Sequence, residues 1–295
     1  MTAARRQPAG RTFVRPVRIT GPEGDWNRLR TDLAGHAHAV VHSRTEDWAP
    51  AAQPQRTQDA FLRARLGRRD WERYRSLRVP AVRERFAASR LLLKAAVAAV
   101  IQVAPQDVEL AYTPAGRPYL PGYDAVQISL SHTGSLLLVG LATCGVIGVD
   151  AERSDRPLYG PGLCRQSCTP HEAGAVEALP RRERDAALVR LWTLKEAYSK
   201  AIGLGLGAGF TEFGFPVDAA AAHVPLCLPD GTPAAGFDRA WTFRTCPVDG
   251  GHTAGIAVAD AGFGPARDVA ASMALDEAVL DAVSETPGAA QESVG

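Results

Sequence analysis

The sequence predicts an α+β fold in which one kind of pattern occurs twice along the chain. Two long segments, near 82–103 and 182–202, have helical periodicity, and short runs of β-branched and apolar residues accompany each of them. The coarse order is strand, helix and strands, followed by helices and strands again, which is typical of α+β proteins. The length of 295 residues allows one large domain or two smaller ones.

The first set of elements is one long helix followed by three strands, and the spacing of apolar residues distinguishes the helix from the strands. A buried helix is expected over 82–103, because its apolar residues repeat at helical spacing until Pro105. Strands are expected at 125–130, 136–142 and 146–150, which are rich in apolar and branched residues. Since the turn Thr143-Cys144-Gly145 joins the last two, we expect the three strands to form one antiparallel sheet.

The second set begins at Thr169-Pro170-His171-Glu172, which offers a capping threonine, a proline in the first turn and an acid three residues after the cap. A long helix follows over 182–202 and stops at Gly203. Alternating stretches near 211–215, 241–245 and 255–258 then predict short strands.

The two ends of the chain differ in charge from the centre. Residues 1–30 are basic and residues 265–295 are acidic, and both are predicted to be poorly ordered extensions of two halves, 31–145 and 146–264. The longest uncharged apolar stretch, Ser135–Val149, is too short to span a bilayer, and no apolar signal segment begins the chain.

Five cysteines without a two-residue spacing favour reduced thiols, so we expect a cytoplasmic protein.

Bulk charge gives no reason to expect a nucleic-acid or membrane partner, because 33 basic residues face 32 acidic ones. Locally, however, Arg56 to Arg90 contains eleven arginines and four acids, which makes this segment a candidate anion site. The alternative is an amphipathic helical region whose arginines form a solvated face.

Two acidic residues, in the segment GVDAE, lie at the end of the strand that begins at Val146. Because strand side chains alternate, Asp150 and Glu152 project to the same side. Hard carboxylate oxygens are the ligands that magnesium prefers, so this pair is a candidate metal site. The alternative is a solvated strand end.

Lysine is rare in this chain, which makes its placement informative. Only Lys94, Lys195 and Lys200 are lysines, and the last two lie in WTLKEAYSK, where Glu196 and Lys200 share one helix stripe. A mobile ammonium suits phosphate chemistry, although an exposed Glu-Lys pair is the alternative. Ser131 and His132, between two strands, are better suited to binding an anionic oxygen than to nucleophilic catalysis.

Four segments taken in order resemble the surfactin-synthetase-type phosphopantetheinyl transferases. They are GRP at 116–118, SLSHTG at 129–134, GVDAE at 148–152 and WTLKEAYSKAIGLGL at 192–206. The resemblance covers roughly residues 36–262 and implies two similar α+β halves, related by pseudo-two-fold symmetry, with the active site at their junction. It also implies a monomer that uses magnesium and coenzyme A.

The resemblance further implies a role for each matching residue. Asp150, Glu152 and Glu196 would bind magnesium, and Glu196 or a metal-bound water would take the proton from the attacking serine. Lys200 would stabilise the breaking pyrophosphate with support from Lys195. The remaining coenzyme A contacts would be Ser131 and His132 at the phosphates, Arg117 near the adenosine, and Arg73 and Arg85 at the 3'-phosphate.

The implied reaction transfers phosphopantetheine from coenzyme A to a serine of an acyl or peptidyl carrier protein of fatty acid, polyketide or nonribosomal peptide synthesis. One departure concerns Ser167 and Cys168, which stand where the family usually has aromatic residues near the carrier-docking surface. The alternatives are a polyanion-binding protein that uses the Arg-rich segment and a catalytically silent regulator that binds coenzyme A or a carrier.

Overall fold

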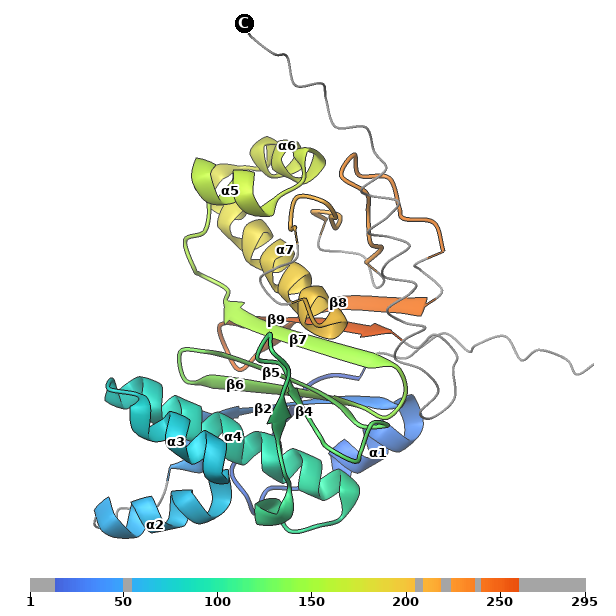
Figure 1. Ribbon diagram of the computed structural model, residues 1–295. Helices are drawn as coiled ribbons and strands as arrows, with labels where there is room; N and C mark the ends of the chain where they lie inside the picture. Colours follow the sequence, from blue (N-terminus) through green and yellow to red (C-terminus); the bar gives the residue numbers. More distant parts are fainter. Residues whose placement is uncertain (1–13, 50–54, 205–208, 219–223, 237–239, 260–295) are drawn as a thin grey trace, which may run out of the picture.

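The computed structural model describes residues 14–49, 55–204, 209–218, 224–236 and 240–259. Its layers are a first helical layer, two sheets and a second helical layer, with the two sheets facing each other in the middle (Figure 1). In chain order the elements are β1 (Val17–Arg18), α1 (Asn27–His36), β2 (His38–Arg44), η1 (Thr45–Trp48), α2 (Gln55–Leu66), α3 (Arg68–Ser76), α4 (Pro80–Ile101), η2 (Pro105–Asp107), β3 (Ala111–Tyr112), β4 (Pro118–Tyr119), β5 (Gln127–Thr133), β6 (Leu136–Ala142), β7 (Val146–Arg153), α5 (Pro161–Ser167), α6 (Pro170–Ala178), α7 (Arg181–Ile202), β8 (Trp241–Val248) and β9 (His252–Ala259).

The predicted repetition is visible in the topology of the two main sheets. One has the strand order β1-β2-β6-β5 and the other has the order β7-β9-β8. In the first sheet β2 precedes the 22-residue helix α4 and the last strand, β6, lies between β2 and β5; in the second, β7 precedes the 22-residue helix α7 and the last strand, β9, lies between β7 and β8. The α+β class and the two long helices are therefore confirmed.

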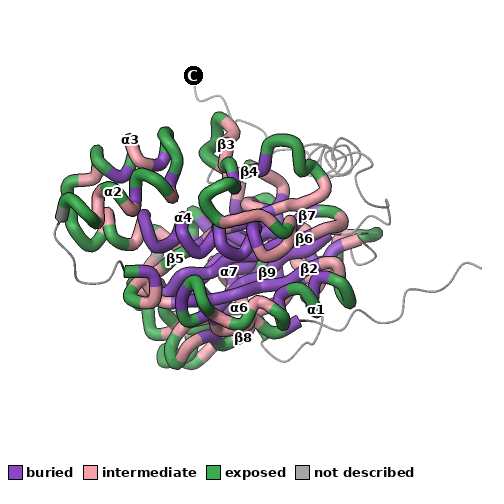
Figure 2. Tube along the Cα trace, turned by 90° about the horizontal axis from the view of Figure 1, so that it is seen from below, coloured by how far each residue is buried: buried purple, intermediate pink, exposed green. Residues whose placement is uncertain are grey.

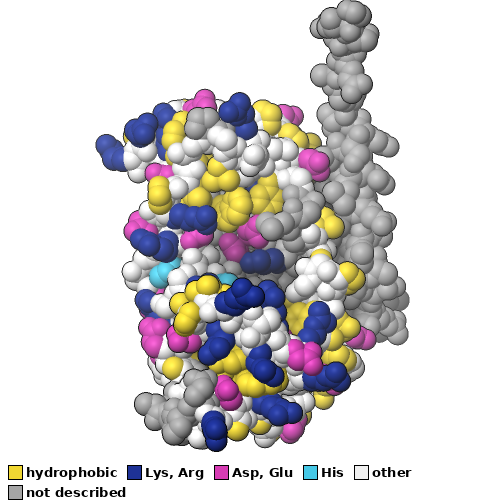
Figure 3. All heavy atoms as spheres, turned by 60° about the vertical axis from the view of Figure 1, so that its left-hand side comes forward, with side chains coloured by type: hydrophobic (Ala, Val, Ile, Leu, Met, Phe, Trp, Pro, Cys, Tyr) yellow, Lys and Arg dark blue, Asp and Glu magenta, His cyan; other side chains and the backbone are white. Residues whose placement is uncertain are grey.

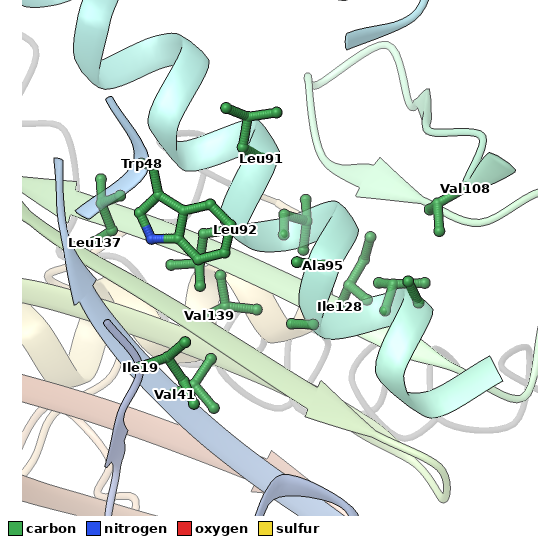
Figure 4. Close-up of a cluster of buried hydrophobic side chains, with 14 of the residues drawn as sticks. Ile19, Val41, Trp48, Leu91, Leu92, Ala95, Val108, Ile128, Leu137 and Val139 are labelled. Atoms are coloured by element: carbon green, nitrogen blue, oxygen red, sulfur yellow. The ribbon is translucent and has the colours of Figure 1, made fainter. Parts of the chain in front are cut away.

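Three apolar clusters stabilise these layers. The first packs α4 against the sheet that contains β6, the second packs α7 against the other sheet, and the third lies between the two sheets. Strand β6 is buried on both faces, since Leu137 and Val139 face α4 while Leu136 and Leu138 face the second sheet (Figures 2 and 4). Burial on both faces explains why its sequence is continuously apolar.

The prediction of one three-stranded antiparallel sheet is wrong for its third strand. Strands β5 and β6 pair antiparallel as expected, but β7 pairs with β9 in the other sheet. The physical reason is that β6 already has β2 on one side and β5 on the other, so it has no free edge. The turn at 143–145 therefore carries the chain from one sheet to the next.

Two further expectations need correction. Residues 14–30 were expected to belong to a poorly ordered extension, but β1 pairs with β2, and Ile19 and Leu29 are buried in the first cluster. Residues 211–215 contribute an isolated bridge, Gly214 to Cys227, and no strand. The expectations for residues 1–13 and for the acidic tail 265–295 fall outside the described residues. All five cysteines are free thiols, as predicted.

No helix in the described part of the chain has the length and hydropathy needed to cross a membrane.

Candidate active site

Helix α7 lies directly on the backbone of the second sheet at two glycines. A β-carbon on Gly148 of β7 would lie 1.8 Å from the carbonyl oxygen of Ala197, and one on Gly255 of β9 would lie 2.3 Å from that of Thr193. Only residues without a side chain permit this approach. As a result, Glu196 and Lys200, one turn apart on α7, come close to Asp150 in the middle of β7.

The centre of the site is a contact between three elements. Lys200 Nζ donates to Asp150 Oδ1 at 2.6 Å and to the hydroxyl of Ser131, on β5, at 3.2 Å. The Ser131 hydroxyl in turn donates to Asp150 Oδ1 at 2.7 Å. Asp150 and Ser131 are buried, whereas the side chain of Lys200 retains 27% of its exposure. The Lys200 ammonium therefore contacts the buried Asp150 carboxylate while its side chain stays partly open to solvent.

Glu196 brings a second carboxylate that is not fully satisfied. Its Oε1 atom is buried and has no hydrogen-bond partner in the described part of the chain. Burial and the nearby charge of Asp150 raise the pKa of Glu196, and Lys200 partly opposes them. A buried carboxylate oxygen without a partner costs free energy, so this position favours a proton or a cation.

Glu152, the third predicted metal ligand, makes other contacts. Its Oε1 atom accepts hydrogen bonds from Thr133 Oγ1 at 2.8 Å and from the Arg153 backbone at 2.8 Å, and its Oε2 atom pairs with Arg156. Among the residues that the structure describes, no three His, Cys, Asp or Glu side chains are grouped so that they could hold a metal ion. The predicted three-carboxylate site is thus not assembled, because Arg156 and Thr133 hold Glu152 separately.

Side-chain hydroxyls connect the two sheets beside this site. Ser129 Oγ accepts a hydrogen bond from the Val149 backbone at 3.0 Å, and Ser131 Oγ accepts one from the Ala151 backbone at 3.3 Å. Together with Thr133, which bonds Glu152, they form a hydroxyl row along β5 that faces β7. The row fixes Asp150 and Glu152 relative to Ser131.

Lys195 does not belong to this site, contrary to the prediction. Its ammonium is fully buried and donates to Glu172 Oε2 at 2.5 Å, to the Ser167 carbonyl at 2.8 Å and to the Phe210 carbonyl. Successive helix residues point about 100° apart, so Lys195 faces α6 while Glu196 faces β7. It stabilises the second half by neutralising Glu172, the buried capping residue of α6.

The remaining predicted residues lie at different places around the site. Arg117 donates to the Ala201 carbonyl at 2.9 Å and lines a cavity of about 250 Å³ together with Ser129, Glu196 and Lys200. His132 follows Ser131 near the end of β5 and is exposed there, although partial burial of its ring and the charge of Arg85 lower its pKa.

Two arginines of the Arg-rich segment complete the predicted set. Arg85, on α4, donates to the Gly134 carbonyl at 3.3 Å, which is two residues beyond His132, whereas Arg73 is exposed on α3. On the face shown in Figure 3, acidic, basic and histidine side chains meet in a recess across the middle of the molecule.

Sequence reasoning missed Ser129, Thr133 and Arg156. The alternation Ser129-x-Ser131-x-Thr133 was a usable signal, since residues two apart on a strand share a face. Arg156 carried no such signal, because its partner Glu152 was interpreted as a metal ligand.

Comparisons with known proteins agree with one another. A profile of the 4'-phosphopantetheinyl transferase superfamily matches residues 146–255. A phosphopantetheinyl transferase of Thraustochytrium sp. is 31% identical over 231 residues, which cover 73% of this chain and 76% of the relative. The 4'-phosphopantetheinyl transferase HetI of Nostoc sp. is 28% identical over 220 residues, 73% of this chain and 87% of the relative. The 4'-phosphopantetheinyl transferase of Bacillus subtilis is 24% identical over 144 residues, 48% of this chain and 61% of the relative.

Proposed function

The chain belongs to the 4'-phosphopantetheinyl transferase superfamily and is a phosphopantetheinyl transferase, and from that premise we propose its reaction in detail. The donor is coenzyme A and the acceptor is a serine of an acyl or peptidyl carrier protein. The serine oxygen forms a bond to the β-phosphorus, the bond from that phosphorus to the bridging oxygen breaks, and adenosine 3',5'-bisphosphate leaves with the bridging oxygen.

The observation that carries this proposal is the meeting of Asp150, Glu196 and Lys200 beside one cavity. Lys200 supplies a mobile positive charge for the leaving pyrophosphate oxygen, because its side chain is partly exposed. Ser131 and His132 bind phosphate oxygens of coenzyme A, and Arg117 lies toward its adenosine. The carboxylate of Glu196 accepts the proton of the attacking serine.

The residues present fit magnesium, which we propose as the cofactor. Asp150 and Glu196 supply hard oxygen donors, and the buried, unpartnered oxygen of Glu196 matches the need for a cation. When bound, magnesium neutralises charge on the pyrophosphate and orients it. Glu152 becomes a third ligand only if it leaves Arg156.

We also propose the surfactin-synthetase-type architecture, in which halves 31–145 and 146–264 are related by a pseudo-two-fold axis in a monomeric, cytoplasmic enzyme. The matching strand orders of the two main sheets support the relation between the halves. Carriers of polyketide and nonribosomal peptide synthesis are the proposed partners.

Mass spectrometry of apo carrier proteins tests the proposal directly. An acyl carrier and a peptidyl carrier are incubated with the full chain, coenzyme A and magnesium, and we expect each to gain one phosphopantetheine. Asp150→Ala should abolish the gain, whereas Arg153→Ala, which removes an exposed pair with Asp155, should not. No gain on any carrier, with coenzyme A still bound in calorimetry, would show a silent binding protein instead.

A further inference from the structure

Lys94 is a buried cation that the transfer reaction does not use. It lies on α4 and is 3% exposed, and its ammonium donates to the Arg65 carbonyl, in the last turn of α2, at 2.6 Å. This bond satisfies one of the carbonyl groups that a helix end leaves free. A lysine ammonium has three donors, so one contact leaves most of its hydrogen-bonding capacity unused.

No carboxylate in the described part of the chain lies within ion-pair distance of this ammonium. The acids that act on it from further away are Asp70, Asp107 and Glu109, and burial lowers the pKa of Lys94 despite them. Two acids line the cavity beside it: Glu23 is exposed to solvent, and Asp47 is already engaged by Arg18 and by the Arg44 backbone. A buried charge without a counter-ion is costly, so the site is incomplete as it stands.

The ammonium borders a cavity of about 500 Å³ that Leu91, Lys94 and Ala95 of α4 help to line. Its floor is mainly apolar and contains Trp48, Leu91 and Ala95, which Figure 4 shows around this part of α4. Phe61 and Arg65 form one wall, and the Arg65 guanidinium stacks 4.0 Å above the Phe61 ring. The volume lies in the range of small-molecule pockets, and the cavity combines an apolar floor with charged groups of both signs at its edge.

This cavity is separate from the transfer site. It is lined from α2, α4, the short helices η1 and η2 and the segment before α1, while the cavity beside Glu196 and Lys200 is lined from α7, β5 and the segment around Arg117. The two sets of lining residues have no member in common.

We propose that the cavity binds a small amphipathic carboxylate, with its acid group on Lys94 and its apolar chain against Trp48 and Leu91. The carboxylate supplies the counter-ion that the ammonium lacks and occupies its free donors. Arg65 at the wall adds a second positive charge, and the apolar floor takes the chain.

Calorimetric titration of the full chain tests the proposal with three probes of equal chain length: octanoate, 1-octanol and octylammonium. Octanoate should bind at least tenfold more tightly than 1-octanol, and octylammonium should not bind. Lys94→Met should weaken octanoate binding at least tenfold and leave 1-octanol unchanged. Arg65→Ala keeps the carbonyl that Lys94 contacts and should weaken octanoate binding a few-fold, so it serves if Lys94→Met does not fold.

Equal affinity for octanoate and 1-octanol overturns the proposal, as does octanoate binding that neither substitution changes. Either result would mean that Lys94 acts only as a cap for α2. Because the readout is binding, the result does not depend on transferase activity.

Discussion

A β-carbon on Gly148 would lie 1.8 Å from the carbonyl oxygen of Ala197, so strand β7 and helix α7 touch backbone to backbone. Gly255 repeats the arrangement on the neighbouring strand, opposite Asp150 in register. Both contacts set how closely Glu196 and Lys200 approach Asp150. The packing of α7 on the sheet therefore determines the geometry of the active site.

Gly148→Ala and Gly255→Ala are each expected to lower the free energy of unfolding by about 3 kcal/mol or more, because the helix must move away from the sheet. Urea denaturation measures the loss. The matched control is Gly174→Ala within α6, where an added β-carbon meets nothing within 4 Å, and which should gain about 0.5–1 kcal/mol. Equal stability of Gly148→Ala and the parent would contradict the close contact.

Lys200→Met should lower the rate constant of phosphopantetheine transfer about 10²–10³-fold, the usual cost of losing one charge-stabilising donor in a transition state. Lys200→Arg should retain part of the activity, since it keeps the charge but not the geometry. A carrier assay at saturating coenzyme A and magnesium measures both. A rate within threefold of the parent for Lys200→Met would remove Lys200 from the mechanism.

Lys195→Met should lower the free energy of unfolding, whereas Lys200→Met should lower the transfer rate. The first substitution leaves Glu172 buried without its cation, and breaking such a pair costs about 3–5 kcal/mol. Thermal and urea unfolding measure the loss, and Lys200→Met, whose side chain is partly exposed, is the comparison. If both lysine variants were equally stable and equally inactive, Lys195 would belong to the active site after all.

Arg156→Ala should strengthen divalent-cation binding several-fold, because it releases Glu152 and removes a positive charge beside the site. Manganese binding, followed by electron paramagnetic resonance, measures the effect without substrate. Arg153→Ala removes a nearby arginine whose partner is the exposed Asp155, and should leave the affinity unchanged. An unchanged affinity in Arg156→Ala would mean that Glu152 does not reach the cation.

His42 should make stability depend on pH in the acidic range. Burial lowers its pKa to about 4 from an unfolded value of 6.5, and its Nδ1 atom has no partner among the residues that the structure describes. The unfolded chain therefore binds a proton first as the pH falls below 6.5, and stability declines until about pH 4, where the folded protein is protonated too. The full effect is about 3 kcal/mol, and less where solvent reaches the ring.

Urea midpoints between pH 4 and pH 7.5 measure this slope. His42→Leu should reduce the dependence of stability on pH in this range, so that only the part due to carboxylate protonation remains. An unaltered slope in that variant would exclude His42 as its source.

The sequence predicted the elements that local pattern controls. Helix α7 was expected at 182–202 and begins at Arg181, and β6 occurs at the predicted residues, since periodicity and the Gly203 stop are local properties. The acids of β7 and the Glu196-Lys200 stripe were likewise located from spacing alone. Strand β7 was assigned to the wrong sheet because pairing depends on which strand edges remain free.

Sequence by itself thus determined the α+β class, the two long helices and the residue types available for phosphate and metal chemistry. Tertiary structure decided which of them meet. One position along α7 separates Lys195, which neutralises Glu172 in the core, from Glu196, which faces Asp150. Arg156 forms an ion pair with Glu152, and Lys94 is buried with no counter-ion among the described residues. These outcomes depend on distances between segments far apart in the chain, which no local pattern records.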